Sequence, residues 1–550
     1  MKKNLTVWNL FSVVILAAFA LFIMYPIFLI LYRSVIHGDT GALTLQNFAH
    51  FFAKKFYWGT MVNSLKVTVV STILSAALGL PLAYLMRSVK IKGSSFLNIL
   101  IVISYLSPPF IGAYAWIQML GRQGVITQFL NDTFGLHYGG VYGFAGIVLV
   151  FTLQSFPLVY IYVSGALKNL DNSLNEAAES LGCSRMGRIW KIIVPLVMPT
   201  LLASSMLVFM RVFADFGTPM LIGEGYKTLP VLIYNQFMGE VSGDDGFAAA
   251  ICCIVIGLTI VMFFVQRFLA GRNTYAMTAL KPMAAESLGG LRNILAHLAV
   301  YMVVGLAILP QFVVVYTSFL ATNRGQVFTG GFALQSYDAT LFAKDNDVIW
   351  HTYFLGLCAI AAVLVLGVLI AYLSVRKRNT LNSILDVITM FPFIIPGSVL
   401  GIAFVFAFNK SPIILTGTAL IMIISFAVRR MPYTVRSSTA ILGNISPSIE
   451  EAAISLGASD MTTFRKITVP MMMPGVLSGA IMSWVTIISE LSSSIILYTN
   501  STQTLTVSIY TEVIRGNYGN ASAYATILTV TSILSLLLFY KVTGRRDVSV

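Results

Sequence analysis

The chain has 550 residues, of which 57% are hydrophobic and only 10% are charged, and its mean hydropathy is +0.84. A soluble domain of ordinary composition carries roughly 25% charged residues, so this composition excludes a protein that is covered by water on all sides, and lipid has to cover it instead. The net charge of +14 suggests no nucleic-acid partner, because the positions of the basic residues explain it better.

Twelve apolar runs are long enough to cross a bilayer, which takes about 20 residues. The first run follows Met-Lys-Lys and is too long for the apolar part of a signal peptide, so we expect it to be retained as a span. The sequence therefore predicts an all-α integral membrane protein with about 12 transmembrane helices. The first six runs lie near residues 10–32, 61–86, 96–120, 143–167, 197–222 and 247–270. The last six lie near residues 296–320, 353–375, 383–408, 413–435, 473–498 and 522–541.

A polar stretch near the middle divides the chain into two halves. We expect a first repeat at 1–270, a cytoplasmic linker at 271–294 and a second repeat at 295–550. Each half contains six spans, so the second half enters the membrane in the same orientation as the first. The halves are therefore predicted to be parallel repeats, related by an axis along the membrane normal.

The basic residues predict the orientation of the spans. If the amino terminus lies inside, 24 of the 35 Lys and Arg residues fall on the inner side. An excess of Lys and Arg in cytoplasmic loops is the usual rule for membrane proteins. We therefore expect a multi-pass protein with both termini in the cytoplasm. The count of 24 places Arg429 and Arg430 at the inner end of the tenth run.

One polar stretch occurs twice in this hydrophobic chain. EAAESLGCSRMGRIWKIIVP occupies 176–195 and EAAISLGASDMTTFRKITVP occupies 451–470, so the copies are 275 residues apart. Twelve of the twenty aligned positions are identical. The same offset relates Pro157 to Pro432, Pro199 to Pro474 and Asp215 to Glu490. A tandem duplication explains this agreement.

Each copy lies between the fourth and fifth spans of its half, on the predicted cytoplasmic side. Capping residues and first-turn acids predict a helix start before each E-A-A triplet. Gly182 and Gly457 then permit a turn, and a second short helix leads into the next span. Two equivalent polar segments predict two docking points for a symmetric partner. The alternative is a helical hairpin that packs on its own chain.

The spacing E-A-A, three residues, Gly, nine residues, I-x-L-P resembles the signature of permease subunits of binding-protein-dependent ABC importers. Both copies replace its leucine by valine, at Val194 and Val469. The resemblance implies the MetI-like fold of type I importers, with coupling loops at about 171–195 and 446–470. It implies ATPase-coupling roles for Glu176, Ala177, Ala178, Gly182, Glu451, Ala452, Ala453 and Gly457.

The same resemblance implies partners and a location. Two copies of an ABC ATPase subunit would bind ATP and dock on the two loops, and an extracytoplasmic substrate-binding protein would deliver the cargo. The location would be the bacterial cytoplasmic (inner) membrane.

The motifs that the sequence lacks agree with a permease whose ATPase is a separate subunit. The chain contains no G-x-x-x-x-G-K-[ST] motif, so it is not expected to bind ATP itself. The four cysteines show no CxxC spacing, and no catalytic set or metal cluster stands out. We therefore expect neither an enzyme nor a cofactor or metal in this chain.

Ionisable residues inside the fifth spans suggest a translocation pathway, because charges in a membrane are costly. Asp215 and its match Glu490 would flank the pathway and favour a cation. Arg211 lies four residues before Asp215, so the two could instead form a self-neutralising pair on one helix face. Arg211 is matched by Thr486, and its unmatched charge leaves an anionic cargo open.

The segment Asp215-Phe216-Gly217-Thr218-Pro219, in a fused double permease, resembles the ferric-iron importer branch. Iron is therefore the expected cargo, with thiamine, aminoalkylphosphonate or another small solute as alternatives. Two other classes of protein stay open: a twelve-helix secondary transporter that needs no ATPase, and a membrane scaffold or receptor that transports nothing. Prolines expected to break the third and ninth spans, at Pro108, Pro109, Pro392 and Pro396, and the acids inside the fifth spans speak against the second.

Overall fold

The computed structural model describes residues 7–37, 41–135, 137–239, 245–270, 285–322, 331–342 and 347–543. Over these ranges the chain is all-helical, and apart from three isolated β-bridges it contains no strand. This confirms the predicted fold class. Most of the predicted linker, at 271–284, and both chain ends, at 1–6 and 544–550, lie outside the described residues.

The first half begins with a long helix that passes through a short π-helical turn and ends with the helix before the linker. Its helices are α1 Val7–Phe19, η1 Ala20–Met24, α2 Tyr25–Ser34, α3 Gln46–Ala53, α4 Lys55–Ser88, α5 Ser94–Leu106, α6 Pro109–Leu120, α7 Val125–Phe134, α8 Gly143–Lys168, α9 Ser173–Ser180, α10 Arg185–Arg188, η2 Ile189–Ile193, α11 Val194–Phe213, α12 Gly217–Ile222, α13 Leu229–Met238 and α14 Asp245–Ala270.

The second half repeats most of this order. Its helices are α15 Gly290–Ser318, α16 Gln335–Leu341, α17 Val348–Arg376, α18 Thr380–Ile388, α19 Phe391–Ile394, α20 Gly397–Phe408, α21 Ala419–Asn444, α22 Pro447–Ser455, α23 Asp460–Thr463, η3 Phe464–Thr468, α24 Val469–Ile488, α25 Ser494–Leu497, η4 Asn500–Thr502, α26 Leu505–Ile514 and α27 Tyr518–Thr543.

Each of the twelve predicted apolar runs lies on a helix or on consecutive helices. In the described part of the chain, nine helices are long and apolar enough to cross a membrane unaided. Two further helix pairs reach this length and hydropathy only together, and they are bent at Pro108 by 100° and at Pro396 by 111°. The predicted run at 413–435 corresponds to α21, which is polar because every 18-residue stretch of it includes three arginines.

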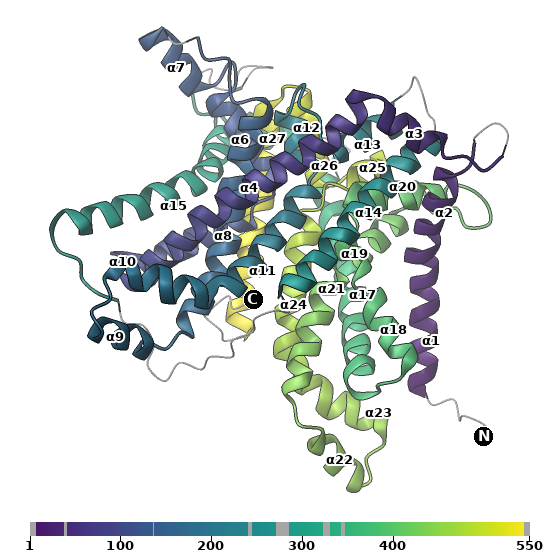
Figure 1. Cartoon of the computed structure of the whole chain (residues 1–550). Helices are drawn as coiled ribbons and strands as arrows, with labels where there is room; N and C mark the ends of the chain where they lie inside the picture. The colour runs from purple at the N-terminus through teal and green to yellow at the C-terminus, as the bar shows by residue number, and fades with distance from the viewer. Residues whose placement is uncertain are drawn as a thin grey trace.

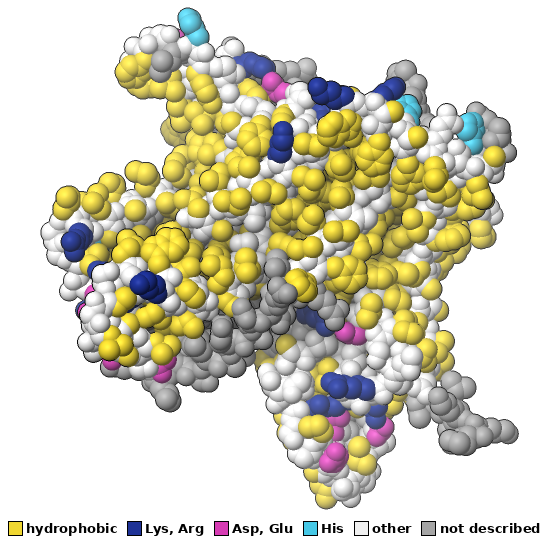
Figure 2. All heavy atoms as spheres, in the orientation of Figure 1, with side chains coloured by type: hydrophobic (Ala, Val, Ile, Leu, Met, Phe, Trp, Pro, Cys, Tyr) yellow, Lys and Arg dark blue, Asp and Glu magenta, His cyan; other side chains and the backbone are white. Residues whose placement is uncertain are grey.

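The outer surface suits a lipid environment. Figure 2 shows hydrophobic side chains over the broad middle of the molecule, with charged side chains near the upper edge and over α22 and α23 at the bottom. Large apolar side chains such as Ile73, Phe264 and Leu538 are at least 60% exposed. In water such exposure would be unfavourable, whereas hydrocarbon chains can cover it.

The two halves repeat their internal contacts as well as their sequence. Gly79 on α4 lies against Val159 on α8, and Gly367 on α17 lies against Thr434 on α21 in the same way. An added Cβ at either glycine would come within 2.9 Å of that neighbour, so only glycine allows the second and fourth spans to approach this closely. The duplication inferred from sequence is therefore present in three dimensions.

Helix α7 interrupts this symmetry. The first half needs residues 121–142 to connect α6 to α8, whereas residues 409–418 connect the equivalent helices α20 and α21. The longer connection forms α7, which projects from the top of the molecule in Figure 1. It carries the exposed apolar side chains Val125, Phe129 and Phe134.

The first span of each half packs against the other half. Helix α1 contacts α17 and α18, and α2 contacts α20, whereas α15 contacts α5 and α6 on the opposite side (Figure 1). The Trp8 ring lies 4.8 Å from Tyr372 and 5.3 Å from Phe464. The two sequence repeats are therefore interlocked in space.

A buried hydrogen bond holds α1 of the first half against α18 of the second half. Ser12 on α1 donates to the Asn382 side-chain oxygen at 2.6 Å, and the Asn382 amide donates to the Lys377 carbonyl at 2.5 Å. We predict that Asn382→Leu destabilises the chain by roughly 1–3 kcal/mol, because it leaves buried polar partners unsatisfied. The thermal unfolding midpoint of the purified chain in detergent measures this.

The neighbouring exposed residue supplies the control for this test. Ser383→Ala removes a hydroxyl on the same helix and should change stability by less than about 0.5 kcal/mol. An Asn382→Leu midpoint equal to that of Ser383→Ala would show that the contact between α1 and α18 does not hold the halves together.

Candidate functional site

The two coupling loops have the same backbone conformation. In each, a helix (α9 or α22), a glycine turn and a short helix (α10 or α23) lead through a π-helical turn into the fifth span. The three helices α23, η3 and α24 begin and end 275 residues after α10, η2 and α11, respectively. The duplicated sequence has therefore kept its local structure.

The glycine turns explain why glycine is present at these two positions. Gly182 has φ +80° and Gly457 has φ +91°, in the left-handed region that other residues avoid. The Gly182 amide donates to the Glu179 carbonyl at 2.9 Å, and the Cys183 amide donates to the Ala178 carbonyl at 2.9 Å. This pair of bonds is the Schellman ending of a helix, and it recurs at Gly457 and Ala458.

The E-A-A triplets present the same faces in both loops. Glu176, Ala177, Glu451 and Ala452 are exposed, whereas Ala178 and Ala453 are buried. In Figure 1, α9 and α22 lie at the lower ends of two separate lobes. Each triplet therefore offers one charged and one small side chain to a partner, while its last alanine packs inward.

A leucine at the tip of each turn was missed in the sequence analysis. Leu181 is 88% exposed and its match Leu456 is 90% exposed. Leucine is usually buried in folded proteins, so two equivalent leucines held out at a rigid turn indicate a contact surface. Its signal was available, because the leucine is identical in both copies of the repeat.

The second coupling loop is tied to the second span of its half. Arg376 at the end of α17 forms a buried ion pair with Glu450 at 2.9 Å and also donates to the Ile445 carbonyl at 2.6 Å. Lys377 pairs with Asp460 at 2.9 Å, and the Trp8 indole donates to the same carboxylate at 3.4 Å. Movement of this loop would therefore be passed directly to α17 and α1.

The first coupling loop has different contacts. In this loop the position that matches Glu450 is occupied by Asn175, which is not ionisable. Glu179 on α9 pairs with Arg188 on α10 at 2.5 Å, within the loop itself. Arg185 lies 3.9 Å from Glu286, whose backbone is hydrogen bonded to Ser88, the last residue of α4, and to Lys90.

The two acids of the fifth spans occupy matching places. Helices α11 and α24 end at Phe213 and Ile488, and the carboxylates of Asp215 and Glu490 lie just beyond. Asp215 accepts a hydrogen bond from the Thr218 amide at 2.9 Å, and Glu490 accepts one from the Ser493 amide at 3.2 Å. Each acid thus fixes the turn that redirects the chain after its span.

The breaks after the two fifth spans also meet each other. Gly217 lies against Leu491, because a Cβ on this glycine would come within 3.0 Å of the leucine side chain. The Phe216 ring lies 6.1 Å from the Tyr510 ring of the second half. The two acid-containing turns are therefore close to the contact between the halves.

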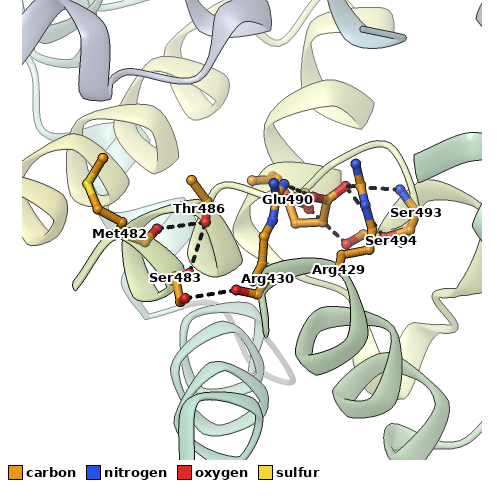
Figure 3. A network of polar contacts seen from close by, with 9 residues as sticks. Arg429, Arg430, Met482, Ser483, Thr486, Glu490, Ser493 and Ser494 are labelled. Carbon is orange, nitrogen blue, oxygen red and sulfur yellow. Dashed lines mark hydrogen bonds and ion pairs between the residues drawn. The ribbon is translucent and has the colours of Figure 1, made fainter. Parts of the chain in front are cut away.

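Glu490 is neutralised, which the sequence did not predict. Figure 3 shows the guanidinium groups of Arg429 and Arg430, both on α21, meeting its carboxylate. Only 2% of the Glu490 side chain is exposed. The two arginines, which the charge count assigns to the inner side, lie in the middle of α21 and pair with this buried acid.

Asp215 has a different environment. Helix α11 stops before Asp215, so Arg211 does not pair with it among the described residues, and the Arg211 guanidinium instead lies 4.7 Å from the centre of the Tyr105 ring. A small cavity beside Asp215 is lined by Ser64, Thr68 and Thr228 together with apolar residues of the first half. The two matched acids are thus unequal, with only one held by arginines.

No resident metal site is present in the part of the chain that the structure describes. No three His, Cys, Asp or Glu side chains there lie close enough together to hold a metal ion.

Comparison with known families matches both halves. The model of the family "binding-protein-dependent transport system inner membrane component" matches residues 75–275 and 363–546, which together make up more than half of the chain. The starts of the two matches are 288 residues apart. Gly79 and Gly367 have the same separation.

Individual relatives point to ion transport systems. The chain is 30% identical over 546 residues to the ferric transport system permease protein FbpB of Actinobacillus pleuropneumoniae, covering 97% of this chain and 78% of the relative. It is 30% identical over 505 residues to the putative ferric transport system permease protein FbpB 1 of Haemophilus influenzae, covering 90% and 78%. The molybdenum transport system permease protein ModB of Escherichia coli is 28% identical over 218 residues, covering 39% of this chain and 93% of the relative.

The unequal acids generate a stability prediction. Glu490→Gln should destabilise the chain by roughly 3–5 kcal/mol, because it leaves two buried guanidinium groups without a counter-charge. Asp215→Asn keeps an oxygen for the Thr218 amide and should cost less than about 1 kcal/mol. Thermal unfolding in detergent compares the two, and equal shifts of the midpoint would contradict the assignment of Glu490 as the structural acid.

Proposed function

This chain belongs to the family of binding-protein-dependent transport system inner membrane components and is the permease of an ABC importer, and from this premise we propose that two ATPase subunits dock on its coupling loops and that its cargo is ferric iron. The chain forms the path through the membrane. ATP is bound and hydrolysed by the partner subunits, while a substrate-binding protein delivers the cargo at the opposite face.

The observation that carries the docking proposal is the pair of exposed turns with the same hydrogen-bond pattern. Each presents a glutamate, an alanine and a fully exposed leucine on a Schellman turn, 275 residues apart. Two identical ATPase subunits need two equivalent surfaces, and these turns provide them on separate lobes (Figure 1). The coupling roles of Glu176, Ala177, Ala178 and Gly182, and of their matches, are part of this proposal.

The proposed docking also supplies a route for force. When the ATPases close, each loop is pushed, and each loop continues through a π-helical turn into its fifth span. The second loop is additionally bound to α17 by the ion pair between Arg376 and Glu450. The two lobes could therefore rock as bodies and expose the path alternately to the two sides.

Iron is proposed because the two ferric transport permeases resemble this chain over 90% or more of its length. The molybdenum permease resembles only 39% of it. Thiamine and aminoalkylphosphonate stay as alternative cargoes for the same importer. A secondary transporter is the alternative mechanism, and it would not require the exposed leucines. We further propose that both termini and both coupling loops are cytoplasmic.

The docking proposal predicts the effect of removing the exposed leucines. Leu181→Ser with Leu456→Ser should weaken ATPase binding at each site at least about tenfold, because an apolar anchor in an interface contributes about 1.5–3 kcal/mol. ATPase recovered with the tagged, membrane-inserted permease measures the loss. Glu451→Arg should also lower coupled ATP hydrolysis, without disturbing the buried pair of Glu450.

The matched control is Leu43→Ser, which alters a leucine that is 82% exposed in the turn between α2 and α3, at the other end of the spans. It should leave ATPase recovery unchanged. If the double leucine variant retained as much ATPase as Leu43→Ser, docking on these turns would be disproved.

The cargo proposal is tested by uptake into proteoliposomes that contain the permease and its ATPase. With the binding protein outside and ATP inside, radiolabelled ferric iron should accumulate, and uptake should stop when ATP is replaced by a non-hydrolysable analogue. Iron uptake driven by an ion gradient without ATP would favour the secondary transporter. ATP-dependent uptake of molybdate but not iron would keep the importer and change its cargo.

A further inference from the structure

We propose that the path binds its cargo through oxyanion groups at a positively charged, tyrosine-lined site between the two halves. The site, called here the Arg–Tyr site, consists of Tyr105, Tyr162, Arg211, Arg430 and Tyr433. The oxyanion is either the transported solute itself or the ligand shell of a ferric ion. This inference rests on the proposed function, because the site has a role only if the chain is a path for cargo.

The Arg–Tyr site draws on both halves. Tyr105, Tyr162 and Arg211 come from α5, α8 and α11, whereas Arg430 and Tyr433 come from α21. The Arg211 guanidinium lies 4.7 Å from the centre of the Tyr105 ring. Arg430 and Tyr433 of the other half lie within electrostatic range of the Tyr105 hydroxyl, and Tyr162 lies within range of Tyr105 and Tyr433. Since these neighbours cross from one half to the other, the side chains face the contact between the halves and not the lipid.

The five side chains are half-buried, while the residues that follow the two arginines on their helices are buried. Val212 next to Arg211 is 3% exposed and Met431 next to Arg430 is 3% exposed. Arg430 and Tyr433 are three residues apart on α21 and therefore share one face. Ionisable residues at membrane depth face the protein interior or a water-filled space, and here they gather on one such face.

The charged side chains in and around the Arg–Tyr site do not cancel one another. Arg211, Arg429 and Arg430 carry three positive charges, and Asp215 and Glu490 carry two negative charges, which leaves an excess of one positive charge. Glu490 is already occupied by two guanidinium groups and the Ser493 amide. The buried Nε groups of Arg429 and Arg430 have no hydrogen-bond partner, so donor capacity is left over.

This chemistry selects against a hydrated cation and for an oxyanion. Guanidinium groups match carboxylate and phosphate-like oxygens in geometry as well as charge, and tyrosine hydroxyls add further donors. Arginine residues in a membrane path favour anions. The expectation that two acids make the path cation-selective therefore does not follow, because the second acid is already neutralised.

The first half lacks the same arginines. The positions that match Arg429 and Arg430 are Gln154 and Ser155, and Gln154 donates to the Pro109 carbonyl at 2.8 Å. The excess charge is thus contributed by one side of the contact between the halves. A cargo that carries its charge on one face would be held in one orientation.

The electrostatic part of the proposal can be tested without cargo or ATP. In the complete complex, with Cys183, Cys252, Cys253 and Cys358 replaced, Tyr433→Cys would be treated in membranes with an anionic and a cationic methanethiosulfonate reagent of similar size. After normalisation to a free thiol, the anionic reagent should react about tenfold faster, the preference expected from one excess charge in a well-solvated site. Arg430→Gln should reduce that ratio to about one.

Three results of this measurement would overturn the proposal. They are a ratio of one or below in the presence of Arg430, no change of the ratio in Arg430→Gln, and no reaction of Tyr433→Cys with either reagent. None of them depends on the transport activity. A complex that takes up no probe but shows the anionic preference would instead contradict the proposed function.

Uptake then distinguishes the two sources of the oxyanion, with radiolabelled ferric citrate and molybdate as probes. Arg211→Gln and Arg430→Gln should each lower ATP-dependent uptake about tenfold, while ATPase recovery stays unchanged. Arg33→Gln, which removes an ion pair with Asp245 on another surface, is the matched control. Uptake in both Gln variants equal to that in Arg33→Gln would overturn the proposal.

Arg211→Gln keeps the test valid if Arg430→Gln fails to fold, because Arg211 forms no ion pair with Glu490. Loss of ferric citrate uptake alone would assign the site to the ligand shell of iron. Loss of molybdate uptake alone would assign it to a free oxyanion.

Discussion

The burial of Glu490 between two arginines is the interaction on which the second half of the molecule depends. Ionic groups in a membrane are tolerated only when they are paired, so α21 and α24 have to stay together wherever the lobe moves. Ser483 strengthens the same contact by donating to the Arg430 carbonyl at 2.9 Å. The turn after α24 is fixed by the Glu490 carboxylate itself. One acid therefore holds two spans and the irregular segment that follows them.

The coupling loops and the centre of the molecule can be understood as one mechanical system. The second loop is tied to α17 by a buried ion pair, α17 packs along α21, and α21 carries Arg430 and Tyr433. A push at α22 therefore reaches the arginines through packed helices and not through flexible segments. The first loop has no matching ion pair at Asn175, so the two loops need not respond equally even though their backbones are alike.

The sequence predicted those features that depend on local patterns. Apolar runs of spanning length predicted the nine spanning helices and the two bent helix pairs of the described residues, and the repeated E-A-A stretch predicted both glycine turns. Contacts between distant residues were not accessible in this way. Arg429 and Arg430 lie about sixty residues from Glu490, so the charge count assigned them to the inner side and not to this acid. The end of α11 at Phe213 separates Arg211 from Asp215, and no periodicity signals that stop. Leu181 and Leu456 were passed over because an apolar residue in a sequence is normally expected to be buried.

The fusion of the two halves into one polypeptide has a consequence for the evolution of the path. In a permease made of two identical chains, every substitution appears twice, so a buried Glu490 with two arginines would be accompanied by a second set across the axis, and the excess charge would double. A tandem chain removes that restriction, because each half inherits its own mutations. The position of Gln154 could stay neutral while an arginine arose at the matching position, Arg429. Covalent linkage thus lets selection adjust the polarity of one wall without altering the opposite wall.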